Sequence, residues 1–418
     1  MNPKLFRYCL FLMPILFLNI KHGANLVLFI TFIGSVIYIS DNIKAIKILE
    51  IINIEILLIF ISPILAIVIS QSIRGEYFIN NWDAPMRLLL CAPIFLAISH
   101  GWILKEDKTS ISRDWLRWSI PIAIPITLIT SNYFPSTTWL THKSNYFVDP
   151  LSFCSYTLLF SFFVIITLIY ESHEANWKRI LIYVVVAIIA IYISSTSGAR
   201  TGWLNLPVFV FICFWVLKKK FGNMQTLFGL SLLIIIIIFI LKFDNQLIIK
   251  MKLGWDQLSN YKFNSMNEDT SIAMRISFYR MGISYFLEKP FAGWGDLSWL
   301  ANFNKNEFLP YASEVTIESP IHGFHNEIIT SMVRAGVFGL IATSSMFIVV
   351  FHQSIKGIGR QLTERHKLIS ICLLIFISHL FLAGLVTEIT NLTFLAAFIG
   401  VVLAVLLGEQ KYLEKNAV

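Results

Sequence analysis

Residues 151–170 read LSFCSYTLLFSFFVIITLIY, twenty positions without a charged side chain. A helix that crosses a bilayer needs about 20 predominantly apolar residues. Runs of this kind recur along the chain, which indicates an all-α polytopic membrane protein. About twelve transmembrane helices are predicted, at residues 8–20, 24–40, 51–70, 85–104, 118–134, 151–170, 180–196, 203–217, 224–243, 328–350, 368–386 and 390–408.

The composition excludes a soluble protein of the same length. Hydrophobic residues make up 56% of the 418 positions and charged residues 14%, against about 45–50% and about 25% in soluble domains. The net charge of +8 does not indicate a nucleic-acid partner, because most basic residues form short clusters between apolar runs. The five cysteines all fall inside apolar runs, so we expect neither a disulfide framework nor a cysteine metal site.

The basic residues predict the orientation of the chain. With the N-terminus in the cytoplasm, the inner segments hold 19 lysines and arginines and the short outer connections hold five. Inner loops of membrane proteins carry such an excess. Both termini are therefore predicted to be cytoplasmic, and the protein is expected to be a multi-pass protein of a bacterial inner membrane.

This topology divides the chain into three parts. Residues 1–243 hold the first nine helices, 244–325 form one large outer loop, and 326–418 hold the last three helices and a short tail. Within the loop, residues 267–270 offer a helix cap, 271–288 predict an amphipathic helix, and Pro290 stops it. A second helix is predicted to start after Ser319-Pro320, to run through His325 into the tenth span, and to end in Gly336 and Gly339.

Arginines on the outer face suggest a binding site for an anion. Arginine is suited to bidentate phosphate recognition, although headgroup contact is an equally ordinary use of such residues. Arg200 is the strongest candidate, since it lies in the polar turn SSTSGARTGW at 194–203. Arg275 and Tyr279 are predicted to share one face of the loop helix, whereas Arg280 points elsewhere, as a support or a solvated charge. The six outer arginines are Arg74, Arg87, Arg200, Arg275, Arg280 and Arg334.

His325 is a candidate general base. Histidine can take a proton near neutral pH, and His325-Asn326 precedes an apolar run; the plain alternative is a histidine packed at a helix start. His322 lies three residues earlier, and the two could share a helix face. No carboxylate at a fitting spacing completes a metal set, and the chain has no nucleotide-binding glycine loop and no Asp-x-Asp pair. No metal, nucleotide or other cofactor is expected.

At these positions the chain resembles the O-antigen ligases, within the O-antigen ligase/polymerase superfamily of bacterial inner-membrane glycosyltransferases. The resemblance covers most of the chain and has the GT-C-like architecture of many spans with one large periplasmic loop. The matching segments are Asp83–Arg87, Ser197–Trp203, Arg275 with the helix that follows, Pro290–Gly295, and His325-Asn326 before Gly336.

The resemblance implies an inverting, metal-independent transfer of O-antigen from undecaprenyl pyrophosphate to lipid A–core on the periplasmic side. It carries over His325 as catalytic residue and Arg200 and Arg275 as ligands of the donor pyrophosphate. Membrane lipids are the other expected partners. Supporting roles are expected for Arg74, Arg87, His322, Arg280, Tyr279 and Asn326.

Three alternatives stay open at this stage. An O-antigen polymerase or a protein O-oligosaccharyltransferase of the same superfamily would share the donor and differ in the acceptor. A flippase for lipid-linked glycans would also need cationic residues, but along both halves of a cavity. The role of Glu388, at the outer end of the eleventh span, is undecided, and so is the oligomeric state.

Overall fold

The computed structural model describes residues 3–42, 54–104, 110–137, 142–171, 176–221, 231, 245–295, 305–319, 323–360 and 362–416. In these ranges the chain is mostly helical, and its β-type pairing is limited to one isolated bridge between Pro135 and Asn145. The α-helices are α1 Pro3–Phe11, α2 Met13–Asn19, α3 Gly23–Asn42, α5 Ile54–Arg74, α6 Asp83–Ser99, α7 Ile111–Asp114, α8 Ile120–Tyr133, α9 Pro150–Glu171, α10 Trp177–Thr196, α11 Leu206–Phe221, α13 Asn245–Ser259, α14 Ser271–Glu288, α16 Lys305–Phe308, α17 Glu314–Glu318, α18 Glu327–Gly359, α19 Glu364–Gly384 and α20 Thr393–Asn416. Shorter 3-10 or π turns are η1 Ile79–Trp82, η2 Trp115–Ser119 and η3 Gly202–Asn205.

Eight helices in the described ranges are long and apolar enough to cross a membrane. They are α3, α5, α6 with its preceding η1 turn, α9, α10, α18, α19 and α20. The predicted first span is divided between α1 and α2, and the fifth and eighth correspond to the shorter helices α8 and α11. The predicted ninth span, 224–243, lies outside the described residues except for residue 231. The prediction of an all-α polytopic membrane protein is confirmed.

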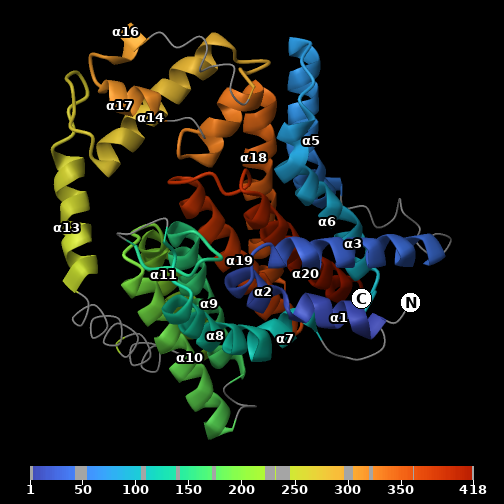
Figure 1. Ribbon diagram of the computed structural model, residues 1–418. Helices are drawn as coiled ribbons and strands as arrows, with labels where there is room; N and C mark the ends of the chain where they lie inside the picture. Colours follow the sequence, from blue (N-terminus) through green and yellow to red (C-terminus); the bar gives the residue numbers. More distant parts are fainter. Residues whose placement is uncertain are drawn as a thin grey trace.

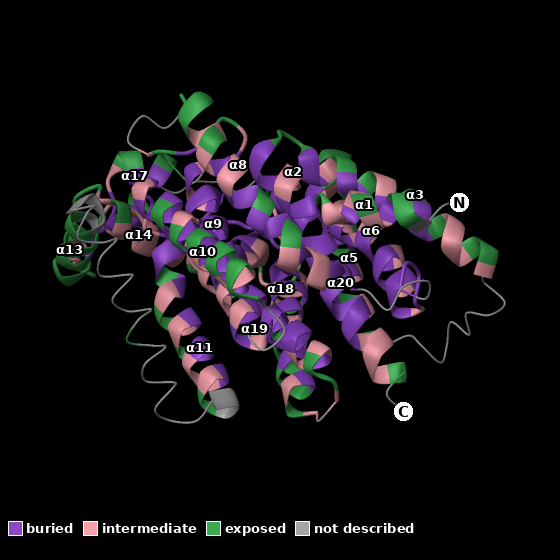
Figure 2. Ribbon diagram, turned by 90° about the horizontal axis from the view of Figure 1, so that it is seen from below, coloured by how far each residue is buried: buried purple, intermediate pink, exposed green. Residues whose placement is uncertain are grey.

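The centre of the bundle consists of α9, α19 and α20. In α9 and α20 89% of the apolar window is buried, against 39% in α3 and in α5. Figure 2 shows the same contrast, with buried positions concentrated on α9 and α20 and exposed ones on α13. Aromatic side chains join these helices to α2: the rings of Phe17 and Phe398 stack at 3.9 Å, and Tyr156 packs edge-on against both. Helices that are apolar on all sides are expected in such a central position.

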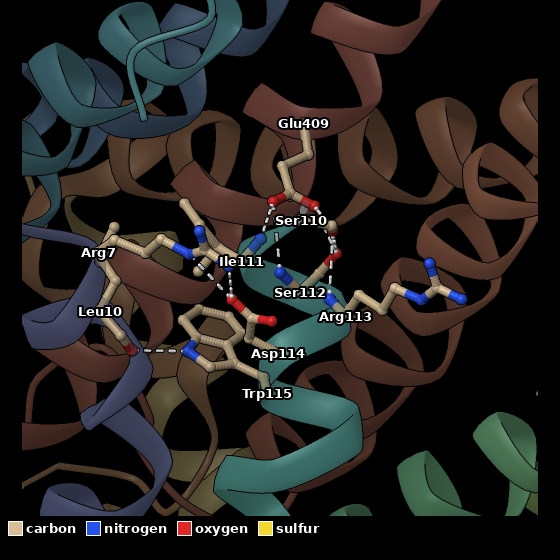
Figure 3. Close-up of polar contacts among 9 residues, drawn as sticks. All are labelled: Arg7, Leu10, Ser110, Ile111, Ser112, Arg113, Asp114, Trp115 and Glu409. Atoms are coloured by element: carbon tan, nitrogen blue, oxygen red, sulfur yellow. Dashed lines mark hydrogen bonds and ion pairs between the residues drawn. The ribbon is translucent and has the colours of Figure 1, made fainter. Parts of the chain in front are cut away.

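A buried carboxylate fixes the end of the bundle that the sequence predicts to be cytoplasmic. Glu409 of α20 is fully buried and accepts hydrogen bonds from the Ile111 amide at 2.5 Å and from the hydroxyls of Ser110 and Ser112 (Figure 3). Arg7 of α1 reaches the same segment through an ion pair with Asp114 at 2.8 Å. This network ties α7 to both ends of the chain and lies apart from the residues discussed below.

The large loop folds into helices α13, α14, α16 and α17, which lie beside and above the bundle in Figure 1. The helix predicted at 271–288 is confirmed at both ends. The Thr270 side chain caps it by accepting from the Ala273 amide, and the chain leaves the helix at Lys289, before Pro290. The loop has a small apolar core of its own, in which Phe278, Tyr285 and Phe324 are buried.

The tenth span, predicted at 328–350, is formed by α18. The prediction that its helix ends in Gly336 and Gly339 is wrong, because the helix kinks at Ala335 and Gly336 and continues to Gly359. The segment 290–295 packs into the kink: the Trp294 amide donates to the Val333 carbonyl at 2.7 Å, and the Val337 amide donates to the Pro290 carbonyl at 2.7 Å. Gly336 has φ +60°, and a Cβ there would lie 2.5 Å from the Pro290 and Phe291 carbonyl oxygens. The glycine therefore redirects the helix at a close backbone contact.

The predicted helix through His325 is also wrong. α18 begins at Glu327, with Asn326 as the cap: its side-chain oxygen accepts from the Ile328 and Ile329 amides at 3.0 Å. His325 lies before the helix with φ +49°. The predicted pairing of His322 with His325 cannot be placed, because His322 lies outside the described residues.

Candidate functional site

Three segments far apart in the sequence meet at one end of the bundle: α14, the start of α18, and the turn that follows α19. The Tyr279 hydroxyl on α14 donates to the Leu385 carbonyl, and the side-chain NH2 group of Asn326 donates to the same oxygen at 3.5 Å. Arg275 lies one helical turn before Tyr279, on the same face of α14. The predicted pair on the loop helix therefore lies beside the residues that precede α18.

His325 is held in an uncommon conformation by its neighbours. A positive φ is sparsely populated for any residue except glycine, and it persists only where surrounding contacts fix it. Here the His325 amide donates to Oε1 of Glu388 at 2.5 Å, and the His325 ring stacks on Phe278 of α14 with 5.5 Å between centroids. The imidazole is partly exposed and fixed on one side by an aromatic ring.

Glu388 connects the site to the turn after α19. Its Oε1 accepts from the Thr330 hydroxyl at 3.1 Å as well as from the His325 amide. Burial raises the pKa of the Glu388 carboxyl above its usual value. The hydrogen bonds of the carboxyl and the charge of Arg334 lower it and offset only part of this rise. Glu327 fixes the neighbouring residues, since its carboxylate accepts from the Ile389 amide at 2.6 Å.

Arg200 extends from a turn that is anchored on α9. The chain leaves α10 through Gly198, which has φ +73°, and Gly202 packs so closely that a Cβ there would lie 2.7 Å from Cys154 Sγ. The glycines of this turn therefore allow the sharp bend and the close packing on α9. Arg200 reaches the loop helices, because a Cβ at Gly254 of α13 would lie 2.6 Å from its Nη1.

The site gathers positive charge in a partly buried place. Burial lowers the pKa of Arg200. Burial also lowers the pKa of Arg275. The charge of Arg200 lowers it as well, whereas Tyr279 and Glu388 raise it in part. The Arg275 Nε is buried without a hydrogen-bond partner among the described residues, and one Nη donates to the Ser271 hydroxyl at 2.7 Å. A buried guanidinium donor on Arg275, beside the second positive charge of Arg200, favours an anionic ligand.

Comparison with protein families identifies the domain that holds this site. Residues 182–344 match the family described as "O-Antigen ligase". This match supports an assignment of the matched part of the chain to the O-antigen ligase/polymerase superfamily. An uncharacterized protein of Haemophilus influenzae is 24% identical over 320 residues, which cover 72% of this chain and 73% of that protein.

The O-antigen ligase match contains Arg200, Arg275 and His325 but ends before Glu388. Its 163 residues run from α10 through the large loop to the middle of α18. In the described part of the chain, no group of three or more His, Cys, Asp or Glu side chains is arranged to hold a metal ion.

The other predicted residues lie away from the arginine pair. Arg74 at the end of α5 donates to the carbonyl of Ala292 and, at 3.2 Å, to that of Arg334, so it holds the segment 290–295 against α5. Arg87 joins α6 to α3 through Asn25 at 2.8 Å. Both are used in packing between elements of the described fold.

Arg280 also has a structural use. Its guanidinium carbon lies 3.6 Å from the centre of the Tyr311 ring, and its Nη1 donates to the Phe263 carbonyl at 2.5 Å. Of the two roles predicted for this residue, the structure favours support: it connects the turn after α13 to the segment before α17. It points away from Arg275, as the helical spacing indicates.

Sequence reasoning selects the arginines and His325 as candidates and leaves Glu388 undecided. The residue stands 63 positions after His325, and its contact with the His325 amide is made by the packing of α18 on α19. The one available signal is a carboxylate at the outer end of an apolar run, where a charged group is costly and its default interpretation is functional.

Proposed function

We propose that this protein is an inverting glycosyltransferase that moves O-antigen polysaccharide from undecaprenyl pyrophosphate to the lipid A–core oligosaccharide. The observation that carries the proposal is that Arg275 lies close enough to be influenced by the charges of both Arg200 and Glu388, and that Glu388 accepts from the His325 amide. The two arginines suit a diphosphate, and the histidine suits a hydroxyl group. The site would face the periplasm of a bacterial inner membrane, with both termini in the cytoplasm.

The arginines would stabilise the leaving group. As the bond between the anomeric carbon and the pyrophosphate oxygen breaks, both bonding electrons stay with that oxygen and negative charge develops on the diphosphate. Groups already fixed toward such charge contribute strongly to catalysis. Arg275 Nε, buried without a partner in the described residues, is positioned to donate to a phosphate oxygen. In this proposal the arginines supply the positive charge, so transfer needs no added metal ion.

His325 would activate the acceptor. Its imidazole would take the proton of the acceptor hydroxyl as the oxygen attacks the anomeric carbon from the face opposite the diphosphate, which inverts that centre. The ring is held by Phe278 and the backbone by Glu388. Restricting the base to one orientation reduces the entropy that the reaction must lose.

The direct test is transfer in vitro with the purified protein, undecaprenyl-pyrophosphate-linked O-antigen and lipid A–core, with chelator and without nucleotide. We expect a lipid A–core product that carries the polysaccharide. Longer lipid-linked chains without that product would identify a polymerase instead. Transfer to a protein acceptor would identify a protein O-oligosaccharyltransferase, and movement of the donor across a vesicle membrane without transfer would identify a flippase.

A positioning role for Glu388 gives a separate prediction. Glu388→Ala removes the acceptor that the His325 amide and the Thr330 hydroxyl share, and we expect kcat to fall by about tenfold, in line with the loss of roughly 1–2 kcal/mol of fixed geometry. Glu388→Gln keeps an acceptor oxygen and should recover most of kcat. If the alanine and glutamine variants lose activity equally, the charge of Glu388 and not its hydrogen bond is what matters.

A further inference from the structure

The large loop holds a cavity that neither Arg200 nor Arg275 lines. It has a volume of about 510 Å³ and lies between α13, the turn after it, and the start of α14. Small-molecule sites usually have volumes of about 300–1,000 Å³. Its walls share helices with the candidate site: Gly254 next to Arg200 belongs to α13, and Arg275 follows the cavity residue Ala273 on α14.

Most of the side chains that line the cavity are polar. The side chains of Asp256, Gln257, Asn260 and Glu268 line the cavity, and the Gln257 Oε1 is buried with no hydrogen-bond partner among the described residues. These planar amides and carboxylates offer both donors and acceptors. A buried amide oxygen without a partner has a desolvation cost that a ligand hydroxyl would relieve.

The rest of the wall is fixed in place. Asn267 closes the turn after α13, because its side chain accepts from the Lys262 amide at 2.8 Å and donates to the Lys262 carbonyl at 2.7 Å. Arg280 approaches the same turn by donating to the Phe263 carbonyl. The cavity is therefore built by a braced turn and two helices.

The charges of the lining distinguish between ligand classes. Asp256 and Glu268 are acidic and Lys262 is the one basic residue among the lining side chains, so the cavity does not favour a phosphate or another anion. Leu253, Met266 and Ala273 add apolar surface. Hydroxyl-binding groups beside apolar ones suit sugar rings, which carry hydroxyls at the edge and C–H groups on the faces.

We propose that this cavity is a glycan-binding subsite that holds sugar units next to the reacting bond. The inference rests on the proposed glycosyl transfer and deepens it by assigning Asp256, Gln257 and Asn260 to the recognition of sugars. The sugar units belong to the donor polysaccharide or to the acceptor core, which share this chemistry and which the experiment separates.

Steady-state transfer is measured for Gln257→Ala, Asn260→Ala and the double variant, with each substrate varied in turn. Losing one hydrogen bond should raise one KM by about fivefold, and losing both should raise it by about twentyfold, with kcat kept within about twofold. The substrate whose KM rises identifies the source of the glycan. Ser259→Ala is the matched control, because Ser259 is exposed on the same helix and does not line the cavity.

A binding measurement separates this inference from the proposed reaction. O-polysaccharide released from its lipid by mild acid, and lipid-free core oligosaccharide, are titrated against the full-length protein in detergent. We expect one of them to bind the wild type and the Ser259→Ala variant equally and the double variant at least tenfold more weakly. Unchanged KM values, or equal binding by the double variant and the wild type, overturn the subsite. Absence of transfer by the wild type refutes the proposed reaction, and titration alone then decides on the subsite.

Discussion

Replacing His325 by alanine is expected to reduce the rate of glycan transfer by about 10²–10⁴-fold, the contribution typical of a positioned general base. Without the imidazole the acceptor hydroxyl has no group to take its proton, while the arginines and the glycan contacts remain. The loss should therefore be in kcat, with the KM of each substrate changed little. The measurement is steady-state transfer by purified variants with matched amounts of folded protein.

Two controls separate chemistry from folding. His325→Gln keeps a planar polar side chain of similar length against Phe278, and it should be as inactive as His325→Ala. His22→Ala is the matched histidine control, because His22 also has a positive φ, +61°, but is exposed in the turn between α2 and α3. Transfer at near-normal rate by either His325 variant would remove the base assignment, as would an equal loss in His22→Ala.

The elements of this fold were predictable where local signals decide the structure. The helix at 271–288 has a capping threonine before it and a proline after it, and both ends are formed as predicted. The apolar runs gave the membrane helices because a backbone in lipid must satisfy its own hydrogen bonds. Such signals act over a few residues and do not depend on the rest of the chain.

The errors occurred where distant segments decide the local conformation. Glycine at 336 suggested the end of a helix, but the partner that its position accommodates is the backbone at 290–291, some 45 residues away. The apolar residues after His325 predict a helix that includes it, whereas its amide donates to Glu388. Neither partner can be identified from the spacing within one segment.

In the candidate site too, local signals predict some residues, whereas the packing of distant segments decides the others. Arginine at 200 and at 275 could be selected from residue type and predicted topology, and the structure brings the two close enough for the charge of Arg200 to lower the pKa of Arg275. The cavity lined by Gln257 could not be predicted, because its walls come from two helices and a turn whose relative positions are set by packing.

The second large effect is expected for Arg200→Lys, which should lower kcat by about 10²-fold although the charge is kept. Lysine is a point charge on a flexible stem and cannot reproduce the planar fork that binds two phosphate oxygens together. The charge on the diphosphate increases as the glycosidic bond breaks, so the interaction strengthens in the transition state. Removing one fixed donor of this kind typically costs a factor of 10²–10³.

The matched control for this variant is Arg179→Lys. Arg179 lies in the first turn of α10 and Arg200 shortly after its last residue, so the two arginines border the same helix at opposite ends. We expect Arg179→Lys to transfer glycan within about twofold of the wild type, and Arg275→Lys to resemble Arg200→Lys. The decisive measurement is whether the loss falls on kcat or on the KM of the donor. If Arg200→Lys raises that KM and leaves kcat unchanged, Arg200 binds the donor equally in the ground and transition states. The departing diphosphate must then be stabilised by another group.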